Sequence, residues 1–168
     1  MKHWLWLSVV VILLDQASKW LVLSMLAPYQ VLELLPNLNL TLLFNRGAAF
    51  SFLADAGGWQ RWLLAGFALL ITVVLVTWLV RLQPGKWLLA SSLALIIGGA
   101  IGNLIDRVVF GHVVDFIQVY LPLIPVRLFN PWPAFNVADS AISVGVVILL
   151  IETFRGEHPK PGVEGSSA

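Results

Sequence analysis

Two aspartates in the last third of the chain are the residues best placed to do chemistry. Asp115 lies in the run Val-Val-Asp-Phe-Ile, and Asp139 lies in Phe-Asn-Val-Ala-Asp-Ser. Taken singly, Asp115 could cap a turn and Asp139 could begin a helix. Together they are harder to explain, because a carboxylate in or beside hydrocarbon is costly and by default a candidate for function. Two carboxylates that share one proton can activate a water molecule and protonate a leaving nitrogen, so the pair predicts an aspartic catalytic dyad.

Other polar residues are spaced so that they can support such a dyad. Asn136 precedes Asp139 by one helical turn, so it can cap a helix or orient the dyad. Asn103 and Arg107 share one helix face, from which they can bond a substrate carbonyl or tune the carboxylates. A surface ion pair between Arg107 and its neighbour Asp106 is the alternative for this arginine.

Two further groups of polar residues occur earlier in the chain. Asp15 and Lys19 share a helix face and are expected to pair with each other or with neighbouring polar groups. Asp15 lies roughly 17 Å along the first apolar segment, near the middle of a bilayer and deeper than Asp139, so a structural role is favoured for it. Asn45 and Gly47 lie in a turn-like string in which the glycine permits close backbone approach.

The composition is that of a membrane protein. Hydrophobic residues make up 59% of the chain and charged residues 11%, with a mean hydropathy of +0.89, far from the values of a soluble domain. Four stretches reach the length of about 20 apolar residues that crosses hydrocarbon. They are residues 4–26, 62–80, 87–105 and 137–154. The first is expected to be a retained helix rather than a cleaved signal peptide. The sequence therefore predicts an integral-membrane domain over residues 1–155.

The connections between these stretches predict where the two aspartates meet. Residues 27–61 contain alternating segments typical of short strands, so a small sheet is expected on the outer surface. Residues 106–136 contain four prolines and cannot form a continuous helix. Asp139 lies roughly 22 Å from the inner end of the last span, shallow beneath the outer surface. Asp115 has enough preceding chain to fold back onto the same layer, and residues 156–168 are expected to be a disordered tail.

Several kinds of chemistry and partner are disfavoured. The chain has no cysteine, which excludes disulfides, thiol catalysis and thiolate metal sites, and its three histidines form no metal-binding pattern. No metal, other cofactor or nucleic acid is expected. Four spans place both termini on one side. Lys and Arg are evenly balanced between the two sides, and only the short loop at residues 81–86 favours cytoplasmic termini.

Five sequence blocks, weak singly, are highly specific in combination and in this order. They are Asp15-Gln-Ala-Ser-Lys19, Asn45-Arg-Gly-Ala-Ala-Phe50, Gly102-Asn-Leu-Ile-Asp-Arg107, Val114-Asp-Phe-Ile117 and Phe135-Asn-Val-Ala-Asp139. With them, the chain over about residues 4–154 resembles the lipoprotein signal peptidases, the bacterial type II signal peptidases.

The resemblance implies a multi-pass protein of the bacterial inner membrane, with four transmembrane helices, cytoplasmic termini and a periplasmic β-sheet cradle above the active site. It implies a substrate, a prolipoprotein whose cysteine already carries diacylglycerol, cut just before that cysteine by a monomeric enzyme in contact with membrane lipid. Position by position, Asp115 and Asp139 match the catalytic dyad. The polar residues around the dyad, which bind substrate or support it, are Asn45, Gly47, Asn103, Arg107 and Asn136; Asp15 and Lys19 are structural. The interval between the two aspartates is longer and richer in proline than expected, which implies a larger outer loop.

Two other classes of protein remain as alternatives. Intramembrane carboxylates also relay protons, so a small proton-coupled transporter or channel is the first. The absence of inverted repeats and the concentration of carboxylates towards one face argue against it. A membrane scaffold that binds other helices through small-residue faces is the second, but a scaffold does not need Asp115 and Asp139 at one depth.

Overall fold

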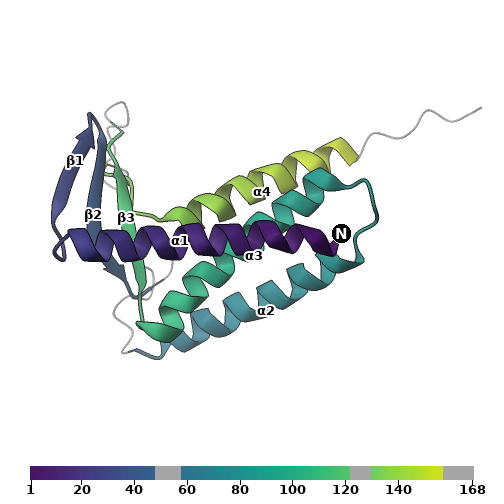
Figure 1. Ribbon diagram of the computed structural model, residues 1–168, viewed down its shortest axis with the longest axis horizontal. Coiled ribbons are helices and arrows are strands. Elements are labelled where there is room, and N and C mark those ends of the chain that lie inside the picture. The colour runs from purple at the N-terminus through teal and green to yellow at the C-terminus, as the bar shows by residue number, and fades with distance from the viewer. Residues whose placement is uncertain (48–57, 122–129, 157–168) are drawn as a thin grey trace, which may run out of the picture.

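The computed structural model describes residues 1–47, 58–121 and 130–156, and these form a helical bundle with a small sheet at one end (Figure 1). The helices are η1 (Lys2–Trp4), α1 (Leu5–Met25), α2 (Gln60–Arg81), α3 (Trp87–Val109) and α4 (Val137–Gly156). The strands are β1 (Val31–Leu35), β2 (Leu38–Asn45) and β3 (Val113–Val119). The expected disordered tail lies outside the described residues, and so do residues 122–129 of the proline-rich interval before α4.

Within the described residues, four helices are long and apolar enough to span a membrane. They are Lys2–Met25, Gln60–Arg81, Trp87–Val109 and Val137–Arg155, which confirms the four predicted spans. The third runs one turn beyond its predicted end at residue 105. It continues because its last polar residues find partners inside the protein, so their polarity does not mark the end of the helix.

Helix α3 is the centre of the bundle and packs against each of the other three helices. In the most apolar stretch of α3, 50% of the residues are buried inside the protein. In the corresponding stretches of the other three spans only 11–28% are buried, so those helices expose most of their residues. Its fully buried residues Leu93 and Ile97 form a core with Leu79 of α2. Apolar side chains exposed over the outer faces, such as Phe67 and Leu70 on α2, are what a lipid-facing helix presents.

The sheet is antiparallel, with strand order β1-β2-β3. The hairpin of β1 and β2 confirms the two strands predicted between the first two spans. Strand β3 was not predicted as a strand. It is rich in β-branched residues, but its first four residues are all buried, so the alternation that marks a half-exposed strand is missing.

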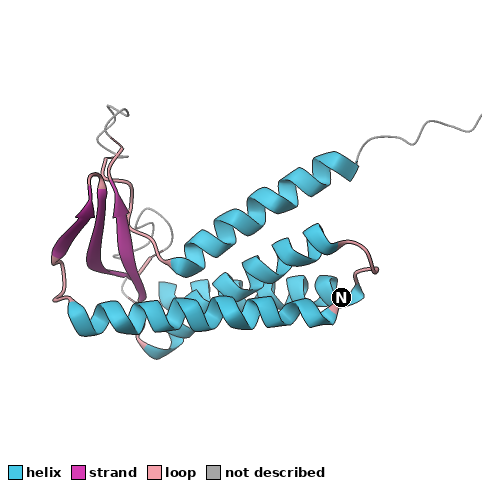
Figure 2. Cartoon of the chain, turned by 45° about the horizontal axis from the view of Figure 1, so that its top comes forward, coloured by secondary structure: helices cyan, strands magenta, loops and turns pink. Residues whose placement is uncertain are grey.

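The sheet rests on the end of the bundle remote from the N-terminus (Figures 1 and 2). The last turns of α1 pass beneath it, and Val22 and Leu26 pack against Leu42, Val114 and Phe116 of β2 and β3. This small core fixes β3, and with it Asp115, over the helix ends. Helix α4 diverges from the other helices towards its C-terminal end (Figure 2).

Candidate active site

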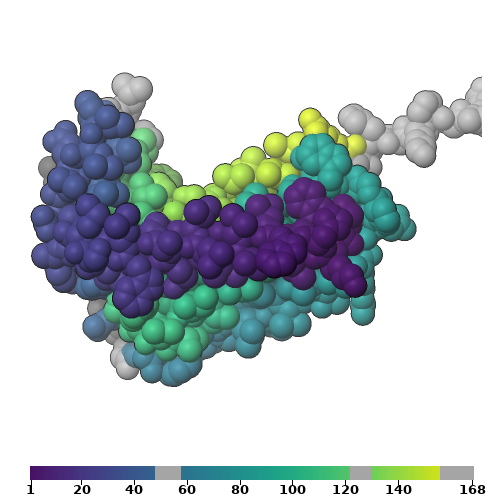
Figure 3. Space-filling view, in the orientation of Figure 1, coloured from purple at the N-terminus to yellow at the C-terminus, as the bar shows by residue number. Residues whose placement is uncertain are grey.

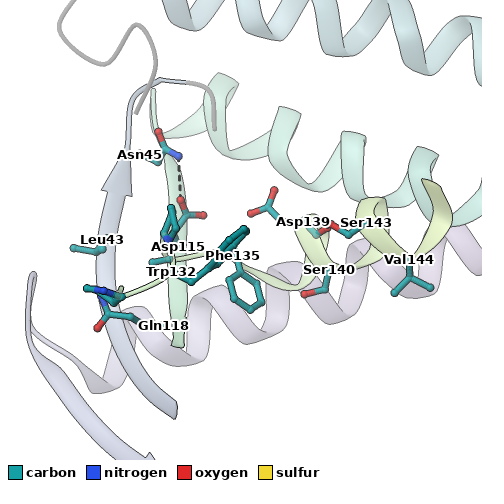
Figure 4. A pocket seen from close by; sticks show the side chains of 13 residues that line it. Leu43, Asn45, Asp115, Gln118, Trp132, Phe135, Asp139, Ser140, Ser143 and Val144 are labelled. Atoms are coloured by element: carbon teal, nitrogen blue, oxygen red, sulfur yellow. Dashed lines mark hydrogen bonds between the residues drawn. The ribbon is translucent and has the colours of Figure 1, made fainter. Parts of the chain in front are cut away.

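The structure brings the two predicted catalytic aspartates to one cavity. Asp115 lies in the middle of β3, and Asp139 lies in the first turn of α4. The cavity has a volume of about 690 Å³ and both residues line it. Their carboxylates face the same space from opposite sides (Figure 4). On the molecular surface the region between the sheet and α4 is hollowed (Figure 3).

A single buried asparagine joins the two aspartates. The Nδ2 of Asn136 donates to Asp115 Oδ1 at 2.8 Å, and the backbone N–H of Asn136 donates to Asp139 Oδ2 at 3.2 Å. The Oδ1 of Asn136 accepts from the backbone N–H of Asp139 at 2.9 Å. This reciprocal pair of bonds is a capping box at the start of α4, so the capping role and the dyad-orienting role considered for Asn136 are both met by one side chain.

Two more asparagines complete the shell around the carboxylates. Asn45 Nδ2 donates to Asp115 Oδ2 at 3.1 Å, and Asn103 Nδ2 donates to Asp139 Oδ1 at 2.8 Å. Each of the four carboxylate oxygens therefore accepts one hydrogen bond from an uncharged N–H group. The amides come from β2, α3 and the start of α4, so three separate elements set the geometry of the pair.

The surroundings of Asp115 favour its protonated form. Burial raises the pKa of Asp115 to about 7, and the neighbouring charge of Asp139 acts in the same direction. Hydrogen bonds from Asn45 and Asn136, and the positive charge of Lys19, oppose this rise in pKa. A carboxyl group with a pKa of about 7 is partly protonated at neutral pH, so it can supply a proton for general acid chemistry.

Arg107 lies beside the dyad without touching it. Its Nη1 donates to the backbone oxygen of Asn103 at 3.2 Å, and its Nη2 donates to that of Gly47 at 3.4 Å. The backbone N–H of Gly47 in turn donates to Asn45 Oδ1 at 3.0 Å. This connects Arg107 to Asn45, which is a hydrogen-bond donor to Asp115. The alternative of a surface pair between Arg107 and Asp106 is wrong, because Asp106 is fully buried and pairs with Lys19.

The expected pairing of Asp15 with Lys19 is present, with 2.8 Å between Lys19 Nζ and Asp15 Oδ2. The expectation that Asp15 lies deeper than Asp139 is wrong. Asp15 Oδ1 accepts a hydrogen bond from the backbone N–H of Ala138, the residue before Asp139. Counting residues along separate helices assumes that they are parallel and begin level, whereas α4 is inclined to α1 and begins beside its middle (Figures 1 and 2).

Asp106 and Gln16 belong to the buried polar centre and were missed as members of it. Asp106 lies three residues after Asn103, a spacing that places both on one side of α3, and this was the available signal. Gln16 Nε2 bonds Asp106 Oδ1 at 2.9 Å and Asp15 Oδ2 at 3.2 Å. Among the described residues, no group of three or more His, Cys, Asp or Glu side chains is arranged to hold a metal ion.

Fold and site together define a multi-pass membrane protein with a buried pair of carboxylates at the junction of a helical bundle and a small sheet. A family model described as signal peptidase (SPase) II matches residues 7–155, which is most of the chain. The chain therefore belongs to the signal peptidase II family, and it is a membrane-embedded peptidase.

Curated relatives agree with this assignment over nearly the whole length. A protein of Pseudomonas paraeruginosa named lipoprotein signal peptidase is 50% identical over 165 residues, covering 96% of this chain and 94% of the relative. A protein of the same name from Pseudomonas putida is 51% identical over 161 residues, covering 95% of this chain and 91% of that relative.

The fold is also that of solved structures. One, titled "Bacterial membrane enzyme structure by the in meso method at 2.3 A resolution", superposes with a TM-score of 0.82 at 26% identity and covers 96% of this chain and 95% of its own. A second structure of the same description, at 1.9 Å resolution, superposes with a TM-score of 0.76 at 27% identity and covers 92% of this chain and 94% of its own.

Proposed function

We propose that this peptidase removes the signal peptide from diacylglyceryl-modified prolipoproteins by aspartic catalysis, cutting before the lipidated cysteine. The observation that carries the mechanism is the pair of carboxylates, Asp115 and Asp139, both held by Asn136 at the wall of one cavity. The names of the relatives supply the substrate class.

The proton balance of the reaction is met by the pair alone. The ionised carboxylate takes a proton from water as the water oxygen attacks the scissile carbonyl carbon, and the protonated carboxyl donates to the carbonyl oxygen. When the tetrahedral intermediate collapses, the C–N bond breaks and the leaving nitrogen takes a proton from the carboxyl that acted as base. As the C=O bond re-forms, the other carboxylate takes back a hydroxyl proton from the intermediate, which restores the starting protonation of the pair. The shared proton belongs to the dyad as a unit rather than to either aspartate.

The cavity suits a substrate anchored in lipid. Beyond the dyad it continues along α4, where Ser140, Ser143 and Val144 line it, and Val144 is 53% exposed. A diacylglyceryl group bound there remains in contact with the surrounding hydrocarbon. Burial of acyl chains contributes about 0.8 kcal/mol per methylene, so an unlipidated substrate is expected to show a much higher KM.

The proposed orientation places the sheet and the cavity at the periplasmic face of the bacterial inner membrane, with both termini in the cytoplasm. The sheet and the α2–α3 loop lie at opposite ends of the bundle (Figure 1). Because the lipid anchor of the substrate holds its scissile bond near the outer interface, the dyad at the sheet end meets it there. The substrate, the lipid bilayer and a single protein chain suffice for this arrangement.

The test is cleavage of a diacylglyceryl-modified prolipoprotein by the purified wild type, Asp115→Asn and Asp139→Asn in lipid nanodiscs. The helical content and the melting temperature are measured in parallel. Wild-type cleavage that disappears in both folded variants supports the dyad and the substrate class together. Cleavage that persists in either folded variant overturns the dyad, and a folded wild type that leaves this substrate intact overturns the substrate assignment.

A further inference from the structure

We propose that two aspartates outside the dyad, Asp15 and Asp106, are positioning residues, each holding the peptide N–H that immediately precedes one dyad aspartate. The inference deepens the proposed aspartic mechanism and rests on it. It replaces the purely structural role expected for Asp15, and it gives Asp106 a role that its sequence context does not suggest.

The two contacts are matched. Asp15 Oδ1 accepts from the backbone N–H of Ala138 at 2.9 Å, and Ala138 precedes Asp139. Asp106 Oδ2 accepts from the backbone N–H of Val114 at 3.0 Å, and Val114 precedes Asp115. Both accepting side chains are fully buried. A carboxylate that accepts a backbone N–H away from water forms a charge-assisted hydrogen bond, which is stronger than one between neutral groups. Each bond therefore restrains the peptide that leads into one dyad aspartate.

Asp15 and Asp106 are the two holding aspartates, and Lys19 connects their carboxylates. Its Nζ lies 2.8 Å from Asp15 Oδ2 and 2.9 Å from Asp106 Oδ2, and it donates to Asn103 Oδ1 at 3.1 Å. Asn103 is itself a donor to Asp139. A single buried ammonium group therefore sets the spacing between the peptide before Asp115, the peptide before Asp139 and one of the amides that orient the dyad.

The packing at Gly102 leaves this arrangement little freedom. A Cβ at that position would lie 2.6 Å from Asp15 Oδ2 and 3.3 Å from the Cβ of Ala138. Only a glycine therefore allows α3, the Asp15 carboxylate and the start of α4 to meet. The requirement for glycine at this point has a direct explanation in the position of the holding carboxylate.

Neither holding aspartate lines the cavity, so neither is placed to touch a substrate, and each acts through the neighbouring peptide. Asp115 is faced by Asp139 of α4, Lys19 of α1 and Arg107 of α3. A shift of either held peptide changes the separation of the two carboxylates. Both the rate and the pH profile of the dyad must then change, because two coupled carboxyl groups titrate as a pair.

The experiment compares Asn and Ala at each holding position, with kcat, KM and the pH profile measured per folded molecule. Asp106→Asn retains an oxygen that accepts from Val114 and leaves Lys19 paired with Asp15, whereas Asp106→Ala removes the acceptor. We expect kcat to fall about 100-fold in the Ala variant with KM little changed. We expect an apparent pKa of the profile to move by about one unit, and the Asn variant to restore most of both. Asp15→Ala is expected to behave like Asp106→Ala. Asp15→Asn keeps an oxygen for the Ala138 N–H but turns its amide nitrogen towards Lys19, so it should restore less than Asp106→Asn does.

Leu93→Ala is the matched control, because Leu93 is a fully buried core residue of α3 far from the dyad contacts. It should lower the melting temperature and leave the pH profile unchanged. Gly102→Ala keeps every polar group and should displace the Asp15 side chain, so it should shift the pH profile as Asp15→Ala does. It takes the place of Asp15→Ala in the experiment if that variant does not fold.

Profiles of the Ala variants and of Gly102→Ala that coincide with the wild-type profile, with activity lost only in proportion to folded protein, would overturn the proposal. Infrared titration of the protonated carboxyl band, with Asp115→Asn as reference, gives the same comparison without turnover. A wild type that does not cleave the substrate counts against the proposed function, while the infrared comparison still decides the positioning role.

Discussion

At the scale of single residues, the dyad is held by neutral donors and not by cations. Each oxygen of Asp115 and Asp139 accepts from an amide or peptide N–H, and in the described parts of the chain no Lys or Arg forms an ion pair with either carboxylate. A cation in direct contact would favour ionisation of both and remove the shared proton. Amide donors also fix the positions of the carboxylates, but they favour the ionised form less than a cation would.

The first prediction concerns the donor from Asn45. Its hydrogen bond lowers the pKa of Asp115, which burial has raised to about 7. Replacing Asn45 with Leu removes this donor and keeps the surroundings dry, so the pKa should rise further. Because the proposed mechanism needs a proton on the pair, the alkaline fall of kcat should move to higher pH, by about one unit. The measurement is the pH dependence of kcat from pH 5 to about 9.

The control for this prediction is Leu43→Val, which trims another residue of the cavity wall without removing a polar group. Its alkaline limb should stay where the wild-type limb lies. A downward shift in Asn45→Leu would mean that water entering the site outweighs the lost bond, and the assigned role of Asn45 would be wrong.

Residue types and spacing were sufficient to select the residues that the structure brings together around the two carboxylates. Asp115, Asp139 and the asparagines Asn103 and Asn136 could be selected because each is a polar residue in an apolar context. Asp106 was missed although its spacing from Asn103 places both on one side of α3, because its covalent neighbour Arg107 offered a plausible surface partner. Only the tertiary structure shows that Asp106 points to α1 and meets Lys19.

At the scale of elements, the start of α4 uses the same atoms for helix capping and for the proposed chemistry. Asn136 is the N-cap, and its side-chain oxygen accepts from the backbone N–H of Asp139. The Asp139 carboxylate accepts in turn from the backbone N–H of Asn136. The first turn of the helix is therefore built around a dyad member. Rotation of the Asp139 side chain away from the cap costs a hydrogen bond, which keeps it aimed at the cavity.

Replacing Asn136 should separate the two roles of this residue. Ser caps about as well as Asn, so Asn136→Ser should be more stable than Asn136→Ala by about 1 kcal/mol. Neither side chain offers an amide to Asp115, so kcat should fall roughly 10- to 100-fold in both. Unfolding in denaturant and single-turnover cleavage measure the two effects. Full activity in the Ser variant would show that the contact with Asp115 contributes nothing.

Close packing of α3 against α4 leads to a prediction about stability. A Cβ on Gly145 would lie 2.7 Å from Ile96 Cγ1 and 2.8 Å from the backbone oxygen of Ser92, so Gly145→Ala should destabilise the protein by about 1–3 kcal/mol. Gly66 of α2 has nothing within 4 Å of the same position. Gly66→Ala should therefore be neutral or should stabilise by roughly 0.5–1 kcal/mol. Equal melting temperatures for the two variants would contradict this account.

Elements differed in how well the sequence could predict them. The four spans follow from hydropathy alone, because a lipid-facing helix must be apolar along its length. The hairpin of β1 and β2 follows from alternation. Strand β3 does not, since it lies between the helix ends and the cavity and is buried over its first residues. The strand that carries Asp115 was thus the element that the pattern rules could not identify.

At the scale of the whole molecule, the polar centre occupies the boundary between the helical bundle and the sheet. Apolar residues of α1, β2 and β3 close one side of it, and the cavity opens on the side of α4. Every buried polar side-chain atom in the described residues has a hydrogen-bond partner. A charged centre at the edge of hydrocarbon is tolerated only with such complete pairing, and completeness in turn fixes its geometry.

The proposed orientation of the molecule leads to the last prediction, and the absence of cysteine makes it simple to test. Glu33 is exposed on β1 at the sheet end, and Gln83 is exposed in the loop between α2 and α3 at the other end. That loop is flanked by Arg81 and Lys86, and short basic loops remain in the cytoplasm. In cells with a permeabilised outer membrane, a membrane-impermeant maleimide should label Glu33→Cys and leave Gln83→Cys unlabelled. After lysis both should label, which controls for reactivity. Labelling of Gln83→Cys alone in intact inner membranes would place the dyad at the cytoplasmic face, where a substrate anchored in the outer leaflet could not reach it.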